Sequence, residues 1–179
     1  MNDGLIPNRY AKALFKFASQ EGVQASVYDE MKQLEQSYAA NTALKTAVNN
    51  PFIAVDEKEK VILTAAGAKA GGAFDRFLLL VIKKNRVDFL RLIAQAYIKL
   101  YRRQCSIAHV EVVTAAKLPD NEINGILDVV KKHLGSKTLE QSFKVDKDLI
   151  GGFTINVDGQ VLDASVKNEL SKLRLKLLS

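Results

Sequence analysis

The chain has 179 residues, of which 47% are hydrophobic and 26% are charged, and its formal net charge is +6. This composition is that of a folded protein with one large domain or two small ones, and it excludes extended disorder. A single cysteine excludes an internal disulfide framework and is consistent with a reducing compartment. The positive charge favours acidic partners: nucleic acid, anionic lipid or an acidic protein surface.

Neither a targeting segment nor a membrane span is expected. The N-terminus MNDGLIPNRY lacks the basic and apolar regions of a secretory signal, and it also lacks the Arg- and Ser-rich pattern of a transit peptide. The longest apolar run, FLLLVI at 77–82, is too short to cross a bilayer. We therefore expect a soluble chain that reaches a membrane only through a complex.

Residues 1–104 repeat apolar side chains at helical spacing. The first predicted helix contains Ile6 to Ala18 and stops at Gly22, and the second covers 23–40. The third is capped by Asn41 or Thr42 and ends before Pro51, and the fourth is capped by Asp56. The fifth and sixth cover 74–84 and about 87–104. Glu59 stands three residues after Asp56, as in a capping box. Consecutive amphipathic helices must bury their apolar stripes against each other, so we expect a six-helix bundle.

The period changes from helical to alternating near residues 104–106. The stretch SIAHVEVVTAAKL predicts a strand, with Ala108, Val110 and Val112 on one face. We then predict a helix from Pro119-Asp120 to Gly135, strands near 139–145, 152–157 and 160–162, and a final helix from about Asp163. Asp158-Gly159 predicts a two-residue hairpin turn between the last two strands.

The last helix carries one apolar stripe, and most of it is expected to pack on the local sheet; its members are Val166, Leu170, Leu173 and Leu177. The predicted fold class is therefore α+β. A six-helix bundle over residues 1–104 is followed by a small C-terminal α/β domain over residues 105–179.

No pattern predicts a catalytic, metal or cofactor site. Gly151-Gly152 precedes Phe153-Thr154 and a strand, instead of Lys-Ser/Thr and a helix, which predicts a bend and no phosphate loop. His109 and His133 are not at metal-ligand spacing. Cys105 has no recognisable catalytic histidine. The sequence therefore favours an interaction protein over an enzyme.

Three stretches resemble one family, the delta subunit of F-type ATP synthase, called the oligomycin-sensitivity-conferring protein in mitochondria. RYAKALFKFA at 9–18 is similar to the family's opening, and FLLLVIKKNRVDFL with AYIKLYRR is similar to its fifth and sixth helices. VDKDLIGGFTINVDGQVLDASV at 145–166 resembles its C-terminal signature. The signature positions here are Leu149, Gly151, Gly152, Asp158, Gly159 and Asp163. The chain departs from the usual pattern at Gln141, Asn156, Asp158, Ala164 and Lys167-Asn168, which affects the details of a basic C-terminal contact surface.

The resemblance implies a non-catalytic stator subunit in the peripheral stalk, one copy per complex. In this family the N-terminal bundle binds the N-terminal helix of an alpha subunit through its first and fifth helices. The implied contacts here are Tyr10, Ala13, Leu14, Leu78 and Val81, and a place in the bundle core is the alternative role for each.

The resemblance also implies that the C-terminal domain binds the stalk b subunits. Leu175 and Leu178 lie off the final apolar stripe and are the implied contacts. No cofactor and no nucleic acid are implied, and the lack of a transit peptide favours the cytoplasmic face of a bacterial inner membrane. The alternative is a basic nucleic-acid-binding or scaffold protein, which salt-sensitive binding to DNA or RNA would select.

Overall fold

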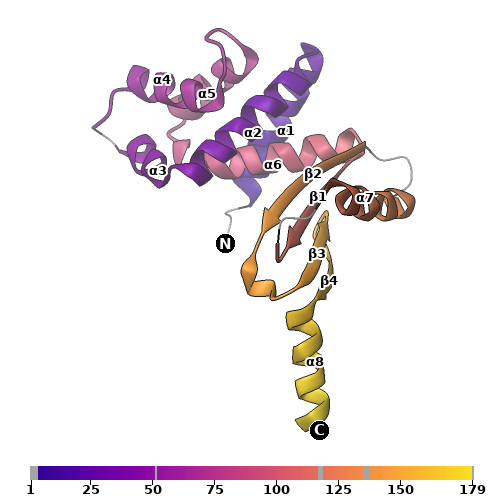
Figure 1. Cartoon of the computed structure of the whole chain (residues 1–179). Helices are drawn as coiled ribbons and strands as arrows, with labels where there is room; N and C mark the ends of the chain where they lie inside the picture. The colour runs from indigo at the N-terminus through magenta and orange to yellow at the C-terminus, as the bar shows by residue number, and fades with distance from the viewer. Residues whose placement is uncertain (1–3, 51, 117–118, 135–137, 179) are drawn as a thin grey trace. The chain divides into compact units, whose positions relative to one another are not determined.

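The chain divides into two compact units. The computed structural model describes residues 4–50, 52–116, 119–134 and 138–178, apart from the side chains at 120, 121, 124, 133, 134 and 178. Unit 1 is Met1–Tyr101 and unit 2 is Arg102–Ser179 (Figure 1). Helices fill the N-terminal part and strands occur in the C-terminal part, which confirms the mixed α+β class.

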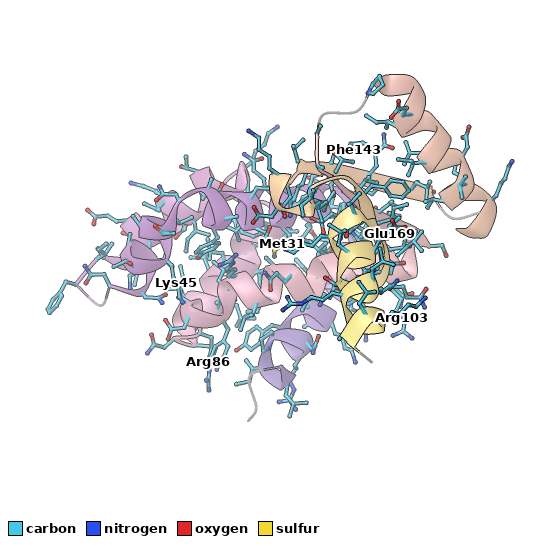
Figure 2. The ribbon with its side chains drawn as sticks, turned by 60° about the horizontal axis from the view of Figure 1, so that its bottom comes forward. Met31, Lys45, Arg86, Arg103, Phe143 and Glu169 are labelled. Carbon is cyan, nitrogen blue, oxygen red and sulfur yellow. The ribbon has the colours of Figure 1, made fainter. Side chains whose placement is uncertain are left out.

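Unit 1 is helical and has its own core. Its elements are α1 (Leu5–Gln20), α2 (Gln24–Ala40), α3 (Thr42–Asn49), α4 (Val55–Ala66), α5 (Ala73–Lys83), η1 (Val87–Phe89) and α6 (Leu90–Gln104), whose last turn falls in unit 2. Figure 2 shows Met31 among these helices, where it is fully buried, while Lys45 and Arg86 point into solvent. Burial of each large apolar side chain stabilises the unit by about 2 kcal/mol before entropy is counted.

Two helix starts test the predicted caps. Asn41 caps α3, because its side-chain oxygen accepts a hydrogen bond from the backbone N–H of Ala43 at 3.1 Å. The predicted cap at Asp56 is wrong: α4 begins at Val55, its N-cap residue is Ala54, and no side chain caps it. Asp56 instead lies in the first turn, where a carboxylate interacts favourably with the helix dipole.

Unit 2 contains a four-stranded mixed sheet. Its elements are β1 (Ile107–Thr114), α7 (Asp120–Leu134), β2 (Thr138–Val145), η2 (Lys147–Leu149), β3 (Gly152–Val157), β4 (Gln160–Ser165) and α8 (Val166–Leu178). The strand order is β2-β1-β3-β4, with β1 and β2 parallel and the other pairs antiparallel. Burial alternates along β1, as predicted. Val110, Val112, Val130 and Ile155 form the core of this unit.

The hairpin between β3 and β4 confirms the predicted turn. Val157 pairs with Gln160, which leaves Asp158 and Gly159 as the two turn residues, with φ values of 50° and 94°. Positive φ at both positions is typical of a tight hairpin turn whose twist matches that of the strands. The Gly159 N–H donates to the Asn156 side chain at 3.0 Å, which fixes the turn further.

The last helix starts later than predicted. Strand β4 continues to Ser165, and α8 begins at Val166 instead of near Asp163. Ser165 is the cap, because its hydroxyl accepts from the Asn168 N–H at 3.2 Å, and Asp163 in turn accepts from the Ser165 N–H at 2.9 Å. Hydrogen bonds to the Asp163 carboxylate, first from the Ser165 hydroxyl and then from the Ser165 backbone N–H, lower the pKa of this carboxyl.

The apolar stripe of α8 does not pack on the sheet, so that prediction is wrong. Its members are exposed to increasing fractions toward the C-terminus: Val166 37%, Leu170 51%, Leu173 55% and Leu177 86%. The helix leaves the end of β4 and extends away from the sheet (Figure 1). The sheet core is filled instead by α7, which supplies Val130.

A fragment of residues 1–104 is expected to fold alone. The reason is that unit 1 encloses a contiguous core of its own, from Ala11 to Ile98. Circular dichroism should give a helical spectrum and a cooperative thermal melt. A disordered spectrum would contradict the prediction.

Candidate partner-binding surfaces

Side chains that could bind a metal ion are scattered in the described part of the chain. No three His, Cys, Asp or Glu side chains within it group as metal ligands. None of the helices described is both long enough and apolar enough to pass through a bilayer. Burial and the nearby positive Arg102 lower the pKa of His109, so this imidazole is neutral at pH 7. Cys105 is exposed, and the His133 side chain lies outside the described residues.

A groove runs between the first and fifth helices of unit 1. We call it the α1/α5 groove; it has a volume of about 380 Å³ and is lined by Ile6, Arg9, Tyr10, Ala13, Phe77, Leu80, Lys84 and Arg86. The rings of Tyr10 and Phe77 meet edge to face across it, with centroids 6.3 Å apart. Leu80 remains 46% exposed at its side. The groove therefore combines an apolar floor with room for one face of a partner segment.

The rim of the α1/α5 groove is basic. Arg9, Lys84 and Arg86 line it, and the described lining residues include no carboxylate. The Arg86 guanidinium lies 6.0 Å from the centre of the Phe89 ring, an arrangement that attracts the cation to the ring face. A partner segment with an apolar face and acidic flanks fits this surface best.

The five residues implied for the alpha-subunit contact separate into two groups. Tyr10 and Ala13 line the groove. Leu14, Leu78 and Val81 are at most 1% exposed and belong to the core of unit 1, so they present no surface in this chain. The lining residues of this segment are Phe77 and Leu80 on α5 and Lys84 directly after its end, whose spacing of three and four places them on one side. Binding of a partner helix at this groove stays a prediction.

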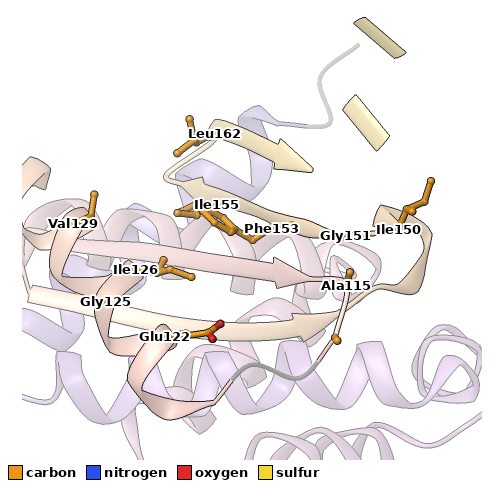
Figure 3. Close-up of a pocket in the computed structure, with 12 residues that line it drawn as sticks. Ala115, Glu122, Gly125, Ile126, Val129, Ile150, Gly151, Phe153, Ile155 and Leu162 are labelled. Atoms are coloured by element: carbon orange, nitrogen blue, oxygen red, sulfur yellow. The ribbon is translucent and has the colours of Figure 1, made fainter. Parts of the chain in front are cut away.

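Unit 2 has an apolar hollow that the sequence did not predict. It has a volume of about 680 Å³ and lies between α7, β3, β4 and the Gly151-Gly152 bend (Figure 3). Among the described residues its lining is apolar apart from Glu122, and it includes Ile126, Val129, Ile150, Phe153, Ile155 and Leu162. Val129, Ile150 and Leu162 are each more than 60% exposed. Exposed apolar side chains gathered around one hollow are typical of a protein-binding surface.

Two of the signature residues, Gly151 and Gly152, lie at the edge of this hollow. Leu149 ends η2, and Ile150 follows with a φ of 66°, which is strained for a β-branched residue. Gly151 accepts a hydrogen bond from the Val166 N–H at 3.0 Å through its carbonyl. Gly152 has a φ of 74°, and a Cβ there would collide with the carbonyl oxygen of Ala164. The glycine pair thus lets the chain turn into β3 directly against β4.

The two residues implied for the stalk contact lie on α8. Leu175 is 69% exposed, off the apolar stripe. The side chain of Leu178 lies outside the described residues. Their role in binding a partner is not decided by exposure, because the whole stripe of α8 is also exposed.

Comparison with known proteins gives one consistent result. The family model for the ATP synthase delta (OSCP) subunit matches residues 6–177. The "ATP synthase subunit delta" of Parabacteroides distasonis is 36% identical over 178 residues, covering 99% of this chain and 98% of that one. The protein of the same name from Microcystis aeruginosa is 33% identical over 172 residues, covering 96% and 94%.

A solved structure shows the same fold. A chain in the cryo-EM structure of the Toxoplasma gondii mitochondrial ATP synthase hexamer matches with a TM-score of 0.72 at 22% identity, over 97% of both chains. The sequence relatives extend over nearly the full length of this chain, and the matched region includes nearly all of both units. The chain therefore belongs to the ATP synthase delta (OSCP) subunit family.

Proposed function

We propose that the two units of this chain hold two different partners and so join the catalytic head of an ATP synthase to its membrane-anchored stalk. As a member of the delta family the chain is a structural, non-catalytic subunit of the peripheral stalk. Its work is then mechanical: it resists the torque that the rotor exerts on the head. We place it on the cytoplasmic face of a bacterial inner membrane.

Unit 1 binds the N-terminal helix of an alpha subunit in the α1/α5 groove. This assignment is carried by one observation, the apolar floor of Tyr10, Phe77 and Leu80 bordered by three basic side chains. An amphipathic helix lays its apolar face into such a groove, and the flanks of the helix meet the rim. Acidic flanks would be attracted by Arg9, Lys84 and Arg86, an effect that salt weakens.

Unit 2 binds the b subunits of the stalk. The hollow between α7, β3 and β4 and the exposed stripe of α8 together give this unit a large apolar surface. Two partner sites on one chain make each attachment intramolecular once the other has formed. The link then holds much more tightly than either contact alone, as a stator requires.

Replacement of Leu80 by aspartate tests the groove. Leu80 is 46% exposed and lines the groove, so Leu80→Asp should leave unit 1 folded. The buried carboxylate in the complex should weaken binding of a peptide that copies the alpha-subunit N-terminus by at least about tenfold, because a charge in an apolar contact is strongly unfavourable. Isothermal titration calorimetry with the full-length chain measures the change.

Leu92→Asp is the matched control. Leu92 lies on α6, is 42% exposed and does not line the groove, so this variant carries the same charge change elsewhere. Its affinity for the peptide should equal that of the unaltered chain. Equal affinities for the Leu80 and Leu92 variants would remove the groove from the proposal. Leu78 is unsuitable for this test, because it is fully buried and an aspartate there would unfold the unit.

A further inference from the structure

The exposed stripe of α8 has the spacing of a coiled-coil seam. Val166, Leu170, Leu173 and Leu177 follow one another at intervals of four, three and four residues. This is a mean period of about 3.5 residues, which keeps one side of a helix facing a second helix. In heptad terms the four residues occupy positions d, a, d and a.

Among the described residues of its unit, the seam is covered mainly at its start. There the Val166 N–H donates to the Gly151 carbonyl, and a Cβ added to Gly151 would lie 2.9 Å from the Val166 side chain. Beyond that residue the seam is more than half exposed at every position. A helix of 13 residues is marginally stable by itself in water, so a covering partner would stabilise it considerably.

The flanks of the seam indicate the charge of the partner. Positions e and g next to the seam hold Lys167, Glu169, Arg174 and Lys176, which are three cations and one carboxylate. In a coiled coil these positions pair with charges on the facing helix. In a parallel pair of two copies of α8, Glu169 of each copy would face Arg174 of the other, but Lys167 and Lys176 would face no carboxylate. An acidic helix therefore satisfies more of these flanking charges than a second copy does.

We propose that α8 forms one strand of a short coiled coil with an acidic heptad-repeat helix of another protein. That partner presents apolar residues at a and d and mainly glutamate or aspartate at e and g. The coiled coil would be one part of the proposed attachment of unit 2 to the stalk. The identification of the partner as a b subunit rests on that proposed function, and the coiled coil itself does not. Leu173 then lies in the contact, whereas Leu175, at position f, faces solvent.

Two designed peptides test the proposal on the full-length chain. Each has three heptads with leucine at a and d, and they differ only in having glutamate or lysine at every e and g. Both repel their own copies, so both stay available for binding. Fluorescence anisotropy at low salt should show at least about tenfold tighter binding of the glutamate peptide, since several weak ion pairs become repulsions in the other. The difference should shrink as salt is added.

A pair of substitutions separates the seam from the rest of the helix. Leu173→Gln should weaken binding of the glutamate peptide several-fold, and Leu175→Gln should leave it unchanged. The two side chains are similarly exposed, 55% and 69%, so neither change should unfold the sheet. Equal binding of both peptides, absence of binding by the glutamate peptide, or equal effects of the two substitutions would overturn the proposal. So would a dimer of the chain in sedimentation that Leu173→Gln abolishes.

The proposal and the function it extends can fail separately. The same anisotropy assay is repeated with the soluble part of the b subunits in place of the designed peptides. Preference for the glutamate peptide, together with no binding of the b subunits, would support the coiled-coil seam and contradict the proposed stalk attachment.

Discussion

Gly152→Ala is expected to unfold unit 2 and to leave unit 1 intact. Gly152 has a φ of 74°, which costs an alanine about 1–2 kcal/mol. The added Cβ would also collide with the carbonyl oxygen of Ala164 and lie 3.2 Å from the Cα of Ser165. Both are backbone atoms of the neighbouring strand and cannot move aside, so the total loss should reach about 3–5 kcal/mol, enough to unfold a small unit.

Hydrogen exchange is the suitable measurement, because it reports each unit separately. The amides of β3 and β4 should lose their protection in the variant, and those of α2 and α6 should keep theirs. All five tyrosines of the chain lie in unit 1, so tyrosine fluorescence during urea unfolding provides an independent check on that unit.

Gly159→Ala is the matched control for backbone strain. Gly159 also has a positive φ, 94°, but a Cβ there would meet nothing within 4 Å. It should therefore cost only about 1–2 kcal/mol. If the two variants lost equal stability, the close approach of Gly152 to β4 would not be the cause.

Removal of α8 is expected to uncouple ATP hydrolysis from proton pumping in the ATP synthase without unfolding unit 2. A chain that ends at Val166 keeps all of β4 and the hydrogen bond from the Val166 N–H to Gly151. It lacks Leu170, Leu173 and Leu177, which form the exposed helical part of the proposed stalk contact, so attachment to the stalk should weaken by at least about 100-fold. In inverted membrane vesicles, ATP hydrolysis should continue while proton pumping falls toward background.

Two measurements decide whether the stalk contact is the cause. Hydrogen exchange should find β1, β3 and β4 as protected in the shortened chain as in the full one, which separates lost contact from lost fold. The double change Leu170→Gln and Leu173→Gln in the full-length chain should reproduce the uncoupling. Normal proton pumping by the shortened chain would show that α8 takes no part in coupling.

Local patterns in the sequence predict much of the fold, because local chemistry determines those elements. The alternation of β1 and the Asp158-Gly159 turn each depend on neighbouring residues alone. The start of α8 differs from the prediction because Asp163 and Ser165 can each cap a helix. Asp163 pairs with Thr154 in the β3–β4 ladder, so the strand continues past it and Ser165 becomes the cap. That pairing is a tertiary contact, which no local pattern contains.

The partner surfaces were harder to predict for a related reason. The fifth helix is apolar continuously from Phe77 to Ile82, so its sequence does not show which side faces the core. Packing buries Leu78 and Val81 and leaves Leu80 beside the groove, the reverse of the contacts that the family resemblance implied. The stripe of α8 was visible in the sequence, but its exposure depends on α7 already covering the sheet.

The way in which α8 continues from β4 determines how unit 2 would carry a mechanical load. Strand β4 pairs with β3 along its whole length, from Gly152 opposite Ser165 to Val157 opposite Gln160. A force transmitted through α8 acts on the C-terminal end of β4 and is directed along the strand. All the hydrogen bonds between β3 and β4 are then loaded in shear at the same time, and they do not break one after another. Unit 2 is therefore built to resist a sustained pull in the direction of its last helix.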